Sequence, residues 1–257
     1  MASETEEEEE SAGPLEYLRW LYLLERVEGQ DGVLWVYDRE VGSIEELGPL
    51  QCGLTASGSY LAALSADPKG TLWALGKDSN LYVITIAGLS CSQSPIRAET
   101  GSFLPESLAF VDIDGANFFY LSGFLASPNG SSSSGLAQVS GSVVEVIGEV
   151  SNFEGQGTVM DISSLPGGEL FGYRSWGGLS ELAEFDSQSA QMLRSWTVPV
   201  GTGQAFGFTM LGEEALLFTA TGADGASELH SFHTVSEAFA LEAELPLTVV
   251  GVAAVAE

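Results

Sequence analysis

The chain has 257 residues, of which 45% are hydrophobic and 17% are charged, so it can bury a sizeable core. Its net charge of -28 comes from 36 Asp plus Glu against 8 Lys plus Arg, which argues against nucleic acid and anionic membranes as partners because both require clustered bases. No apolar run approaches the roughly 18 residues of a transmembrane helix, and the 31 glycines favour many short strands joined by tight turns.

An acidic low-complexity segment, Ser3 to Pro14 (SETEEEEESAGP), opens the chain. It has too few apolar residues to offset the entropy of ordering, so residues 1–14 are predicted to be a disordered acidic tether. The segment is similar to the spacer that follows the lipidated cysteine of bacterial surface lipoproteins, although that cysteine is missing here. The start, Met1-Ala2-Ser3, has no apolar core like a signal peptide, so a secreted chain would have lost its leader, with Met1 in its place. We expect an extracytoplasmic protein, secreted or lipid-anchored; the alternative is a charge run that serves only solubility.

Three strands are predicted next, at Tyr17 to Glu25, Val33 to Asp38 and Ser43 to Leu47. The first of these also has the Leu, Glu and Arg content of a helix over Tyr17 to Val27. Its aromatic content and the number of repeated units that follow favour a strand.

A strand–turn–strand unit then recurs, which is typical of propellers and solenoids. Its copies span Tyr60 to Leu75, Ser107 to Leu121, Val159 to Tyr173 and Phe206 to Thr219. A third strand follows each copy, at Asn80 to Ile84, Gly135 to Val139, Leu179 to Phe185 and Glu228 to Phe232. A more polar fourth strand ends each unit, at Cys91 to Arg97, Ser142 to Ile147, Gln191 to Trp196 and Phe239 to Glu244.

One small apolar strand, Thr248 to Val255, remains at the end of the sequence. Together with the three strands at the beginning it makes one further four-stranded unit. Residues 15–257 are therefore predicted to form an all-β, five-bladed β-propeller of four-stranded antiparallel blades, closed by the C-terminal strand joining the N-terminal blade. The alternatives are an open β-sandwich and a six-bladed ring.

Two of these strand segments carry a resemblance to known repeats: Gly70-Thr-Leu-Trp-Ala-Leu75 and Val33-Leu-Trp-Val-Tyr-Asp38. They resemble the degenerate propeller repeats of secreted bacterial proteins, the broad class with YVTN-type, NHL and pyrroloquinoline-quinone-like repeats. The resemblance implies a fold and no particular activity.

The two cysteines, Cys52 and Cys91, lack the spacing of a metal site. The predicted strands place Cys52 in a loop at one rim of the ring and Cys91 near the start of a strand from the other rim. Because a disulfide requires Cα atoms within about 7 Å, we expect two free or buried thiols rather than a bridge.

Ligands of a propeller usually meet the loops between the second and third strands and between blades. Lys77 and Arg174 fall in the same loop of two blades, and Trp176, Phe153 and Phe103 join them. An exposed aromatic side chain beside a cation suits a sugar, an aromatic ligand or a peptide carboxylate. The predicted binding site is therefore Lys77, Phe153, Arg174 and Trp176. The alternative is that Trp176 packs between blades and the cations form ion pairs.

Asp161 is the only acid well inside a predicted inner strand. A glycosidase needs two carboxylates about 5 to 10 Å apart, and one acid is not a pair. The other acids of the inner hairpins (Asp67, Asp112, Asp114 and Glu213) fall at turns, where Asp serves turn geometry.

Metal and cofactor chemistry have little support. Asp112 to Asn117 resembles half of a calcium loop, but an ordinary hairpin turn explains the same residues. His230 and His233 lie three apart on a predicted strand, which points them to opposite faces. We expect no catalytic set, no metal and no cofactor.

These observations predict a monomeric, non-catalytic, extracytoplasmic binding or interaction propeller whose ligand is a protein or a carbohydrate. The alternatives are a carbohydrate-active enzyme with Asp161 at its centre and a structural scaffold on a cell surface.

Overall fold

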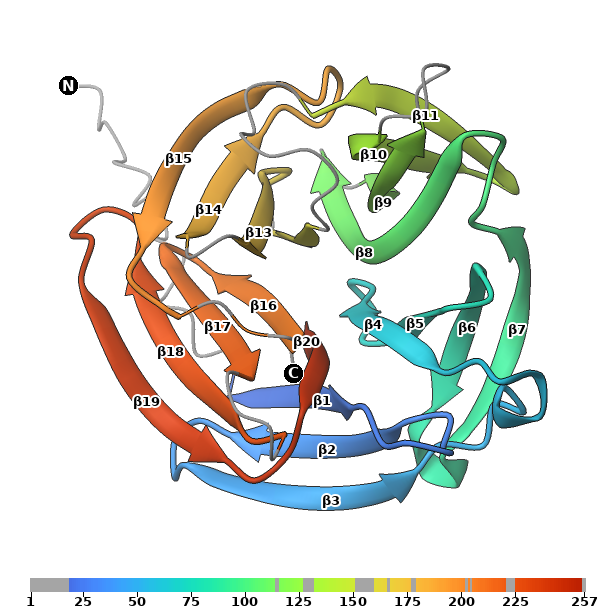
Figure 1. Cartoon of the computed structure of the whole chain (residues 1–257), viewed down its shortest axis with the longest axis horizontal. Helices are drawn as coiled ribbons and strands as arrows, with labels where there is room; N and C mark the ends of the chain where they lie inside the picture. The colour runs from blue at the N-terminus through green and yellow to red at the C-terminus, as the bar shows by residue number, and fades with distance from the viewer. Residues whose placement is uncertain are drawn as a thin grey trace, which may run out of the picture.

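The computed structural model of the chain describes residues 19–113, 116–126, 132–150, 160–165, 167–176, 179–201, 203 and 205–255. Five four-stranded antiparallel sheets surround one axis in this part of the chain (Figure 1). The prediction of a five-bladed all-β propeller is confirmed, and the sandwich and the six-bladed ring are wrong. The predicted tether, residues 1–14, lies outside the described residues.

Each blade consists of four strands, ordered from the innermost strand outward. The first blade is β20 (Val249–Ala254), β1 (Trp20–Glu25), β2 (Val33–Asp38) and β3 (Ser43–Pro49). The second is β4 (Leu61–Ala66), β5 (Leu72–Gly76), β6 (Asn80–Thr85) and β7 (Ser90–Arg97). The third is β8 (Phe103–Ile113), β9 (Ala116–Ala126), β10 (Ser132–Ser140) and β11 (Val143–Glu149). The fourth is β12 (Asp161–Ser164), β13 (Leu170–Trp176), β14 (Leu179–Phe185) and β15 (Met192–Val198). The fifth is β16 (Ala205–Leu211), β17 (Glu214–Ala220), β18 (Ser227–His233) and β19 (Phe239–Leu245). Two short 3-10 helices, η1 (Thr55–Ser57) and η2 (Ile86–Gly88), lie in connections.

The ring closes where β20 pairs antiparallel with β1, with Leu21 opposite Ala254 and Glu25 opposite Val249. β1 is a strand, so the alternative of a helix there is wrong. Alternate side chains of β1 bury against different blades: Leu21 and Leu23 pack with the fifth blade, and Leu24 packs with the second. A strand covered on both faces is apolar throughout, which explains why its composition also suits a helix.

The core lies in layers between neighbouring blades, because each sheet is covered on both faces. Tyr173 of the fourth blade and Phe208 of the fifth, for example, pack with their ring centroids 5.9 Å apart. Phe103, which the sequence placed among exposed loop residues, is 1% exposed in β8 and belongs to the layer between the second and third blades. The third blade has longer strands than predicted, and this extension buries Phe103.

The innermost strands approach one another closely around the axis. A Cβ atom on Gly251 of β20 would lie 2.6 Å from the backbone nitrogen of Leu64 on β4. A Cβ atom on Gly207 of β16 would lie 3.4 Å from the nitrogen of Gly251. The ring therefore requires glycine at Gly251, since only a residue without a side chain fits this approach.

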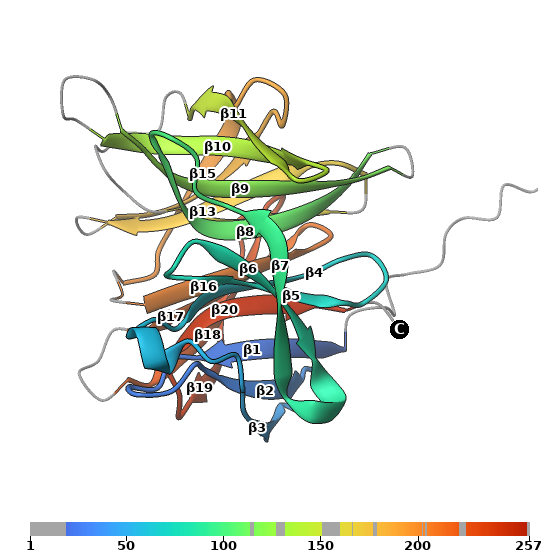
Figure 2. The ribbon, with the colours of Figure 1, turned by 90° about the vertical axis from the view of Figure 1, so that its right-hand side faces the viewer.

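Because each blade is twisted, its outer strand runs in a different direction from its inner strand. This change of direction brings Cys52 and Cys91 together. A twist of about 20–25° per strand amounts to roughly 60–75° across a blade. Figure 2 faces the second blade, where β7 crosses β4 steeply, and Figure 1 shows β3 ending beside the start of β7. The backbone nitrogen of Gln51 donates to the carbonyl of Leu89 at 2.8 Å, and Cys52 and Cys91 form a disulfide with Cα atoms 4.6 Å apart.

The expectation of two separate thiols is therefore wrong. The prediction placed the two cysteines at opposite rims of the ring and therefore too far apart. The twist of the blade instead places the end of one blade's outer strand next to the beginning of the following blade's outer strand. The disulfide thus links the first blade to the second.

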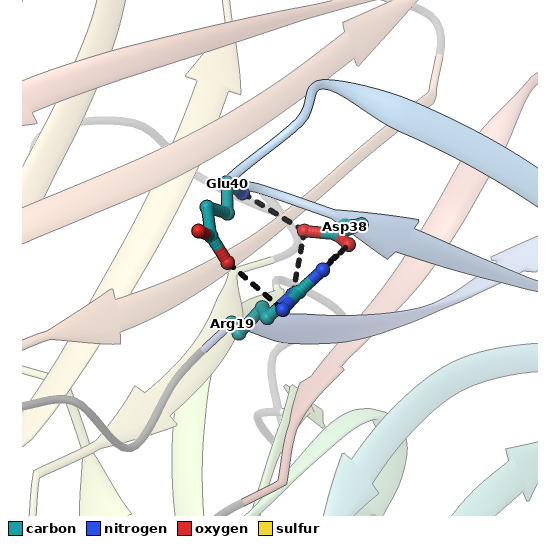
Figure 3. A network of polar contacts seen from close by, with 3 residues as sticks. All are labelled: Arg19, Asp38 and Glu40. Atoms are coloured by element: carbon teal, nitrogen blue, oxygen red, sulfur yellow. Dashed lines mark hydrogen bonds and ion pairs between the residues drawn. The ribbon is translucent and has the colours of Figure 1, made fainter.

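A polar network closes the outer end of the β1–β2 pair (Figure 3). Arg19 donates from Nε to both oxygens of Asp38, at 3.0 and 2.9 Å, and its Nη1 lies 2.8 Å from Glu40. The hydrogen bonds from Arg19 hold the pKa of Asp38 below its ordinary value, against the opposing effect of burial. These contacts hold Arg19, the residue directly before β1, against the end of β2.

Candidate binding cavity

The propeller has two faces, which are named here by the end of the inner strands that lies at each of them. The inner strands begin at the amino-end face and end at the carboxyl-end face. Lys77 and Arg174 of the predicted binding site belong to the amino-end face, where the second strands end and the third strands begin. The described cavity lies at the opposite, carboxyl-end face.

The cavity has a volume of about 230 Å³ and lies where the five inner strands end. Each inner strand contributes to its wall: Ser65 of β4, Phe110 of β8, Ser163 of β12, Thr209 of β16 and Val252 of β20. A concave position with walls from several structural elements is typical of small-molecule sites in proteins. Its lining mixes apolar side chains with hydroxyls and carboxylates.

Hydrogen bonds between neighbouring inner strands hold the wall in place. The Ser164 hydroxyl donates to the carbonyl of Phe110, which joins β12 to β8. On the other side, the Met210 amide donates to Ser163 Oγ at 3.1 Å, and the hydroxyls of Ser163 and Thr209 lie 3.4 Å apart. The lining is therefore largely pre-formed, which limits the conformational entropy that the protein loses when a ligand binds.

Asp67, at the β4–β5 hairpin, contributes a carboxylate to the lining. Its Oδ1 accepts from the amides of Lys69 and Thr71, each at 2.9 Å, and its Oδ2 accepts from Trp73 Nε1 at 3.4 Å. The predicted turn role of Asp67 is thus confirmed. Asp112, the second carboxylate of the lining, comes from the end of β8.

Asp161 lies in the wall between blades rather than in the cavity. Its Oδ1 accepts from the Ser107 hydroxyl and from the Ile162 amide at 3.1 Å, and its Oδ2 accepts from the Phe208 amide at 2.9 Å. It thereby joins the inner strands of three blades. Burial raises its pKa to about 7, although these hydrogen bonds act in the opposite direction.

A glycosidase built on Asp161 would need that carboxylate at a substrate. Asp161 does not line the described cavity, and both of its oxygens are held by neighbouring strands. Its position is that of a structural cross-link, so the geometry gives no support to hydrolysis through Asp161.

The two predicted cations of the amino-end face both form ion pairs. Lys77 contacts Glu106 of the third blade. Arg174 is 6% exposed, lies within β13 rather than in a loop, and its Nη2 is 2.6 Å from Oε2 of Glu181, directly across the β13–β14 pair. The prediction that Arg174 occupies an exposed loop is wrong, because β13 is longer than the sequence pattern indicates.

Neither aromatic side chain of that predicted site belongs to the part of the chain that the structure describes. Trp176 ends β13, and the position of its side chain is outside what the structure describes. Phe153 lies outside the described residues. The site of Lys77, Phe153, Arg174 and Trp176 therefore stays a prediction.

Asp31, in the β1–β2 loop of the amino-end face, was not singled out by the sequence. Its Oδ2 accepts from the amides of Cys52 and Gly53, both at 2.7 Å, and its Oδ1 accepts from the Thr55 amide at 2.7 Å. Burial acts to raise its pKa, but the hydrogen bonds outweigh burial and hold the pKa below its ordinary value. Asp31 thus anchors the connection between the first two blades beside the disulfide.

The described residues contain no cluster of three or more His, Cys, Asp or Glu side chains suited to a metal. His230 pairs with Glu228 at 3.0 Å and His233 with Glu213 at 3.4 Å, so each imidazole has its own carboxylate. Asp114 and Gly115 of the half calcium loop lie outside the described residues. In the described part of the chain, no helix is long and apolar enough to cross a bilayer.

The hydroxyl residues of the cavity were missed by sequence reasoning, although a signal for them exists. Ser65, Ser163 and Thr209 lie near the ends of three inner strands, where a purely structural strand would carry apolar residues. Small polar residues at equivalent positions of several repeats indicate a polar lining at one end of the axis.

Comparison with known proteins supports the fold. No protein-family model matches the chain, and no curated protein matches it in sequence. In structure the chain is similar to TolB from Acinetobacter baumannii, with a TM-score of 0.50 and 10% identity over 86% of this chain and 52% of that one.

Two further solved structures are more distant. The Dos1 propeller gives a TM-score of 0.42 at 11% identity, over 88% of this chain and 55% of that one. Hydrazine synthase from Kuenenia stuttgartiensis gives 0.45 at 11% identity, over 81% of this chain and 59% of that one. The chain thus spans little more than half the length of the structures that it resembles. At such low identity, the similarity to TolB shows the propeller fold alone.

Proposed function

We propose that the protein is a non-catalytic, extracytoplasmic binding propeller that holds a small ligand, or one side chain of a protein partner, in the axial cavity. The observation that carries this proposal is the cavity of about 230 Å³ whose walls come from all five inner strands. Such a site is concave, mostly apolar and supplied with a few fixed polar groups, which are the properties of ligand sites in general.

A binding role fits the lining better than catalysis. Among the described residues, the cavity is lined by no His, Cys, Lys or Tyr, the side chains that most often transfer protons or attack substrates. Asp67 is engaged in its hairpin turn. Asp112 is the other acid of the lining, and the lack of a basic side chain or an activated nucleophile in the described lining favours recognition over general acid–base chemistry.

The disulfide supports an extracytoplasmic location, since disulfides persist in oxidising compartments and are rare in reducing ones. The acidic segment Ser3 to Pro14 would then serve as a solvated spacer between the propeller and a surface. Alkylating the protein in its native cells before denaturation tests this location. Unmodified Cys52 and Cys91 are expected, whereas alkylation of both would contradict the proposal.

The binding role is tested with variants of the cavity. Ser65→Phe fills the lining from β4, and Ser92→Phe places the same side chain at an exposed position of the outer strand β7 in the same blade. A set of small aryl compounds is screened by ligand-observed NMR against the wild type and both variants.

The expected result is binding to the wild type and to Ser92→Phe, with loss of binding to Ser65→Phe. Compounds that bind all three proteins equally, or no binding to any of them, would contradict a ligand site in the cavity and favour a scaffold. Circular dichroism of each variant checks that the fold is retained. Static light scattering tests the accompanying expectation of a monomer.

A further inference from the structure

Both carboxylates of the axial cavity are already engaged. Oδ1 of Asp67 accepts from two amides of its own hairpin, and Oδ2 accepts from Trp73. Asp112 has an interaction partner of its own. Lys69 is exposed in the same hairpin as Asp67 and adds a positive charge beside the cavity. The described edge of the cavity thus has charges of both signs, and its two carboxylates already have partners.

A charged ligand group would therefore lose more than it gains here. An anion would enter against Asp67, Asp112 and the net charge of -28. A cation would compete with the donors that the two carboxylates already have, and Lys69 would repel it. Removing a charge from water without a new partner is costly, so the lining favours an uncharged group.

The polar capacity that remains at the cavity belongs to two hydroxyls of its lining. Ser163 and Thr209 lie 3.4 Å apart, and Ser163 also accepts from the amide of Met210 at 3.1 Å. A hydroxyl has one hydrogen to donate and two lone pairs. These contacts use one hydrogen and two lone pairs, which leaves one hydrogen and two lone pairs for a ligand. A ligand hydroxyl, which both donates and accepts, matches this hydroxyl pair.

The apolar part of the lining includes a packed aromatic group. Phe110 stacks on Phe119 with ring centroids 4.6 Å apart and planes 2° apart, and Trp73 packs against the two rings at 5.7 and 5.8 Å. Rings held in this way form a rigid surface, against which a further ring packs in an offset or edge-to-face geometry. Ile162 and Val252 add aliphatic surface. The lining therefore suits an aromatic body.

The volume limits the size of that body. A dry cavity of about 150 Å³ holds one benzene molecule, so the present cavity of about 230 Å³ admits one ring with a short substituent. The rest of a larger ligand would extend past the rim.

Resting on the proposed binding function, we infer that the axial cavity selects an uncharged phenol group. The hydroxyl pair of Ser163 and Thr209 binds the phenol oxygen, and the ends of the inner strands enclose the ring. A free phenol and the tyrosine side chain of a protein share this chemistry. Phenol, toluene, benzylammonium and benzoate have similar bodies, and they separate the effect of the hydroxyl from those of shape and charge.

The dissociation constants of the four probes are measured by NMR titration of the full chain at neutral pH. Phenol is expected to bind about threefold to tenfold more tightly than toluene, which is the range of one neutral hydrogen bond. Benzylammonium and benzoate are expected to bind at least about tenfold more weakly than phenol, because each would bury a charge without a partner. Tighter binding of either ion than of phenol would overturn the inference.

The hydroxyl pair is tested with Thr209→Val, which keeps the branched shape and removes one hydroxyl. It should weaken phenol about threefold to tenfold and leave toluene unchanged, so that the preference for phenol is lost. Thr219→Val makes the same change at a buried position of β17 in the same blade, outside the described lining, and should alter neither affinity. Equal effects of the two variants, or an unchanged preference for phenol in Thr209→Val, would overturn the role of the hydroxyl pair.

Failure of the inference is distinguishable from failure of the proposed function. Equal binding of phenol and toluene to the wild type, with loss of both in Ser65→Phe, overturns phenol selection but leaves a ligand-binding cavity. No binding of any probe to the wild type overturns both.

The source of the phenol group is identified with two tripeptides, Gly-Tyr-Gly and Gly-Phe-Gly, both blocked at their ends. If the tyrosine peptide binds at least as tightly as phenol and the phenylalanine peptide does not, the inference is supported and the source is a protein partner. If phenol alone binds, the inference is supported and the source is a free small molecule. Tighter binding of the phenylalanine peptide than of the tyrosine peptide would overturn the inference.

Discussion

The carboxylate of Asp161 accepts a hydrogen bond of 2.9 Å from the amide of Phe208, so that one side chain of the fourth blade holds the inner strand of the fifth. The same carboxylate accepts from Ser107 of the third blade. Three neighbouring inner strands are thus joined by an acid in a buried position. Its ionisation is linked to the stability of the ring.

Asp161 gives stability a dependence on pH in a defined window. Its pKa rises from 3.8 to about 7 on folding, so between these values the native state binds more protons than the unfolded state. The contribution of Asp161 to the free energy of unfolding is therefore largest below pH 3.8 and falls as the pH rises towards 7. In Asp161→Asn the free energy of unfolding should lose this contribution to its pH dependence, whatever the change in absolute stability. Denaturant unfolding from about pH 4 to 8 measures it, and identical slopes in the two proteins would contradict the prediction.

Asp31 should stabilise the fold at neutral pH and lose this effect in acid, which is the opposite direction from Asp161. Its pKa is held below its ordinary value of 3.8, so its contribution is present above that value and is lost as the pH falls below it. Asp31→Ala removes the acceptor of three amides and should lower the free energy of unfolding by about 2–3 kcal/mol at neutral pH. The difference from the wild type should shrink in acid. A difference that stays constant from neutral pH to about pH 3 would contradict this assignment.

The disulfide should stabilise the native state by restricting the unfolded chain. Cys52 and Cys91 are 39 residues apart, and a loop of this length corresponds to about 2–4 kcal/mol. Replacing both by Ser should lower Tm by about 5–15 °C in differential scanning calorimetry. Adding a reductant to the wild type should produce a similar shift, and it should produce none in the double variant. A wild-type Tm insensitive to reductant would contradict the prediction.

Arg174 should be important for stability and Lys77 should not. Arg174 is buried against Glu181, so Arg174→Ala leaves a half-buried carboxylate without its partner and should cost about 2–3 kcal/mol. The Lys77 pair is more exposed, and Lys77→Ala should cost less than about 1 kcal/mol. Urea unfolding distinguishes them. The binding site predicted on the same face for a sugar, an aromatic ligand or a peptide carboxylate is tested with Lys77→Ala and Trp176→Ala. Glycan and peptide arrays are used, and binding that is unchanged in both variants would contradict that site.

Gly251 should tolerate no side chain. Gly251→Ala places a Cβ atom 2.6 Å from the backbone of Leu64, and relief of that contact should cost about 1–3 kcal/mol. Gly148→Ala on the outer strand β11 is the matched control, since a Cβ atom there meets nothing within 4 Å. It should be neutral or slightly stabilising. Equal thermal stability of the two variants would contradict a close approach at the axis.

The blades could be predicted from the sequence because each strand carries its own local pattern. Val33 to Asp38 and Leu179 to Phe185 coincide with observed strands, and the apolar Val249–Ala254 identified the closing strand. The ion pair of Arg174 with Glu181 was also within reach, since the two residues are symmetric about the β13–β14 turn.

The arrangement between blades could not be predicted in the same way. The pairing of Cys52 with Cys91 depends on the accumulated twist of a whole blade, and the hydrogen bonds of Asp31 depend on the path of a connection. Ser65, Ser163 and Thr209 are far apart in the sequence and meet only because the inner strands share one axis. Local patterns describe strands, whereas sites between blades depend on three-dimensional geometry.

The pairing of β20 with β1 also has a consequence for synthesis on the ribosome. The first blade lacks its innermost strand until β20 has left the exit tunnel, although the other strands of that blade are made first. Leu21 and Leu23 also remain uncovered until the residues of the fifth blade have been made. The nascent chain should therefore complete its fold late and in one step, and it should depend on chaperones that shield an unpaired strand edge until the ring can close.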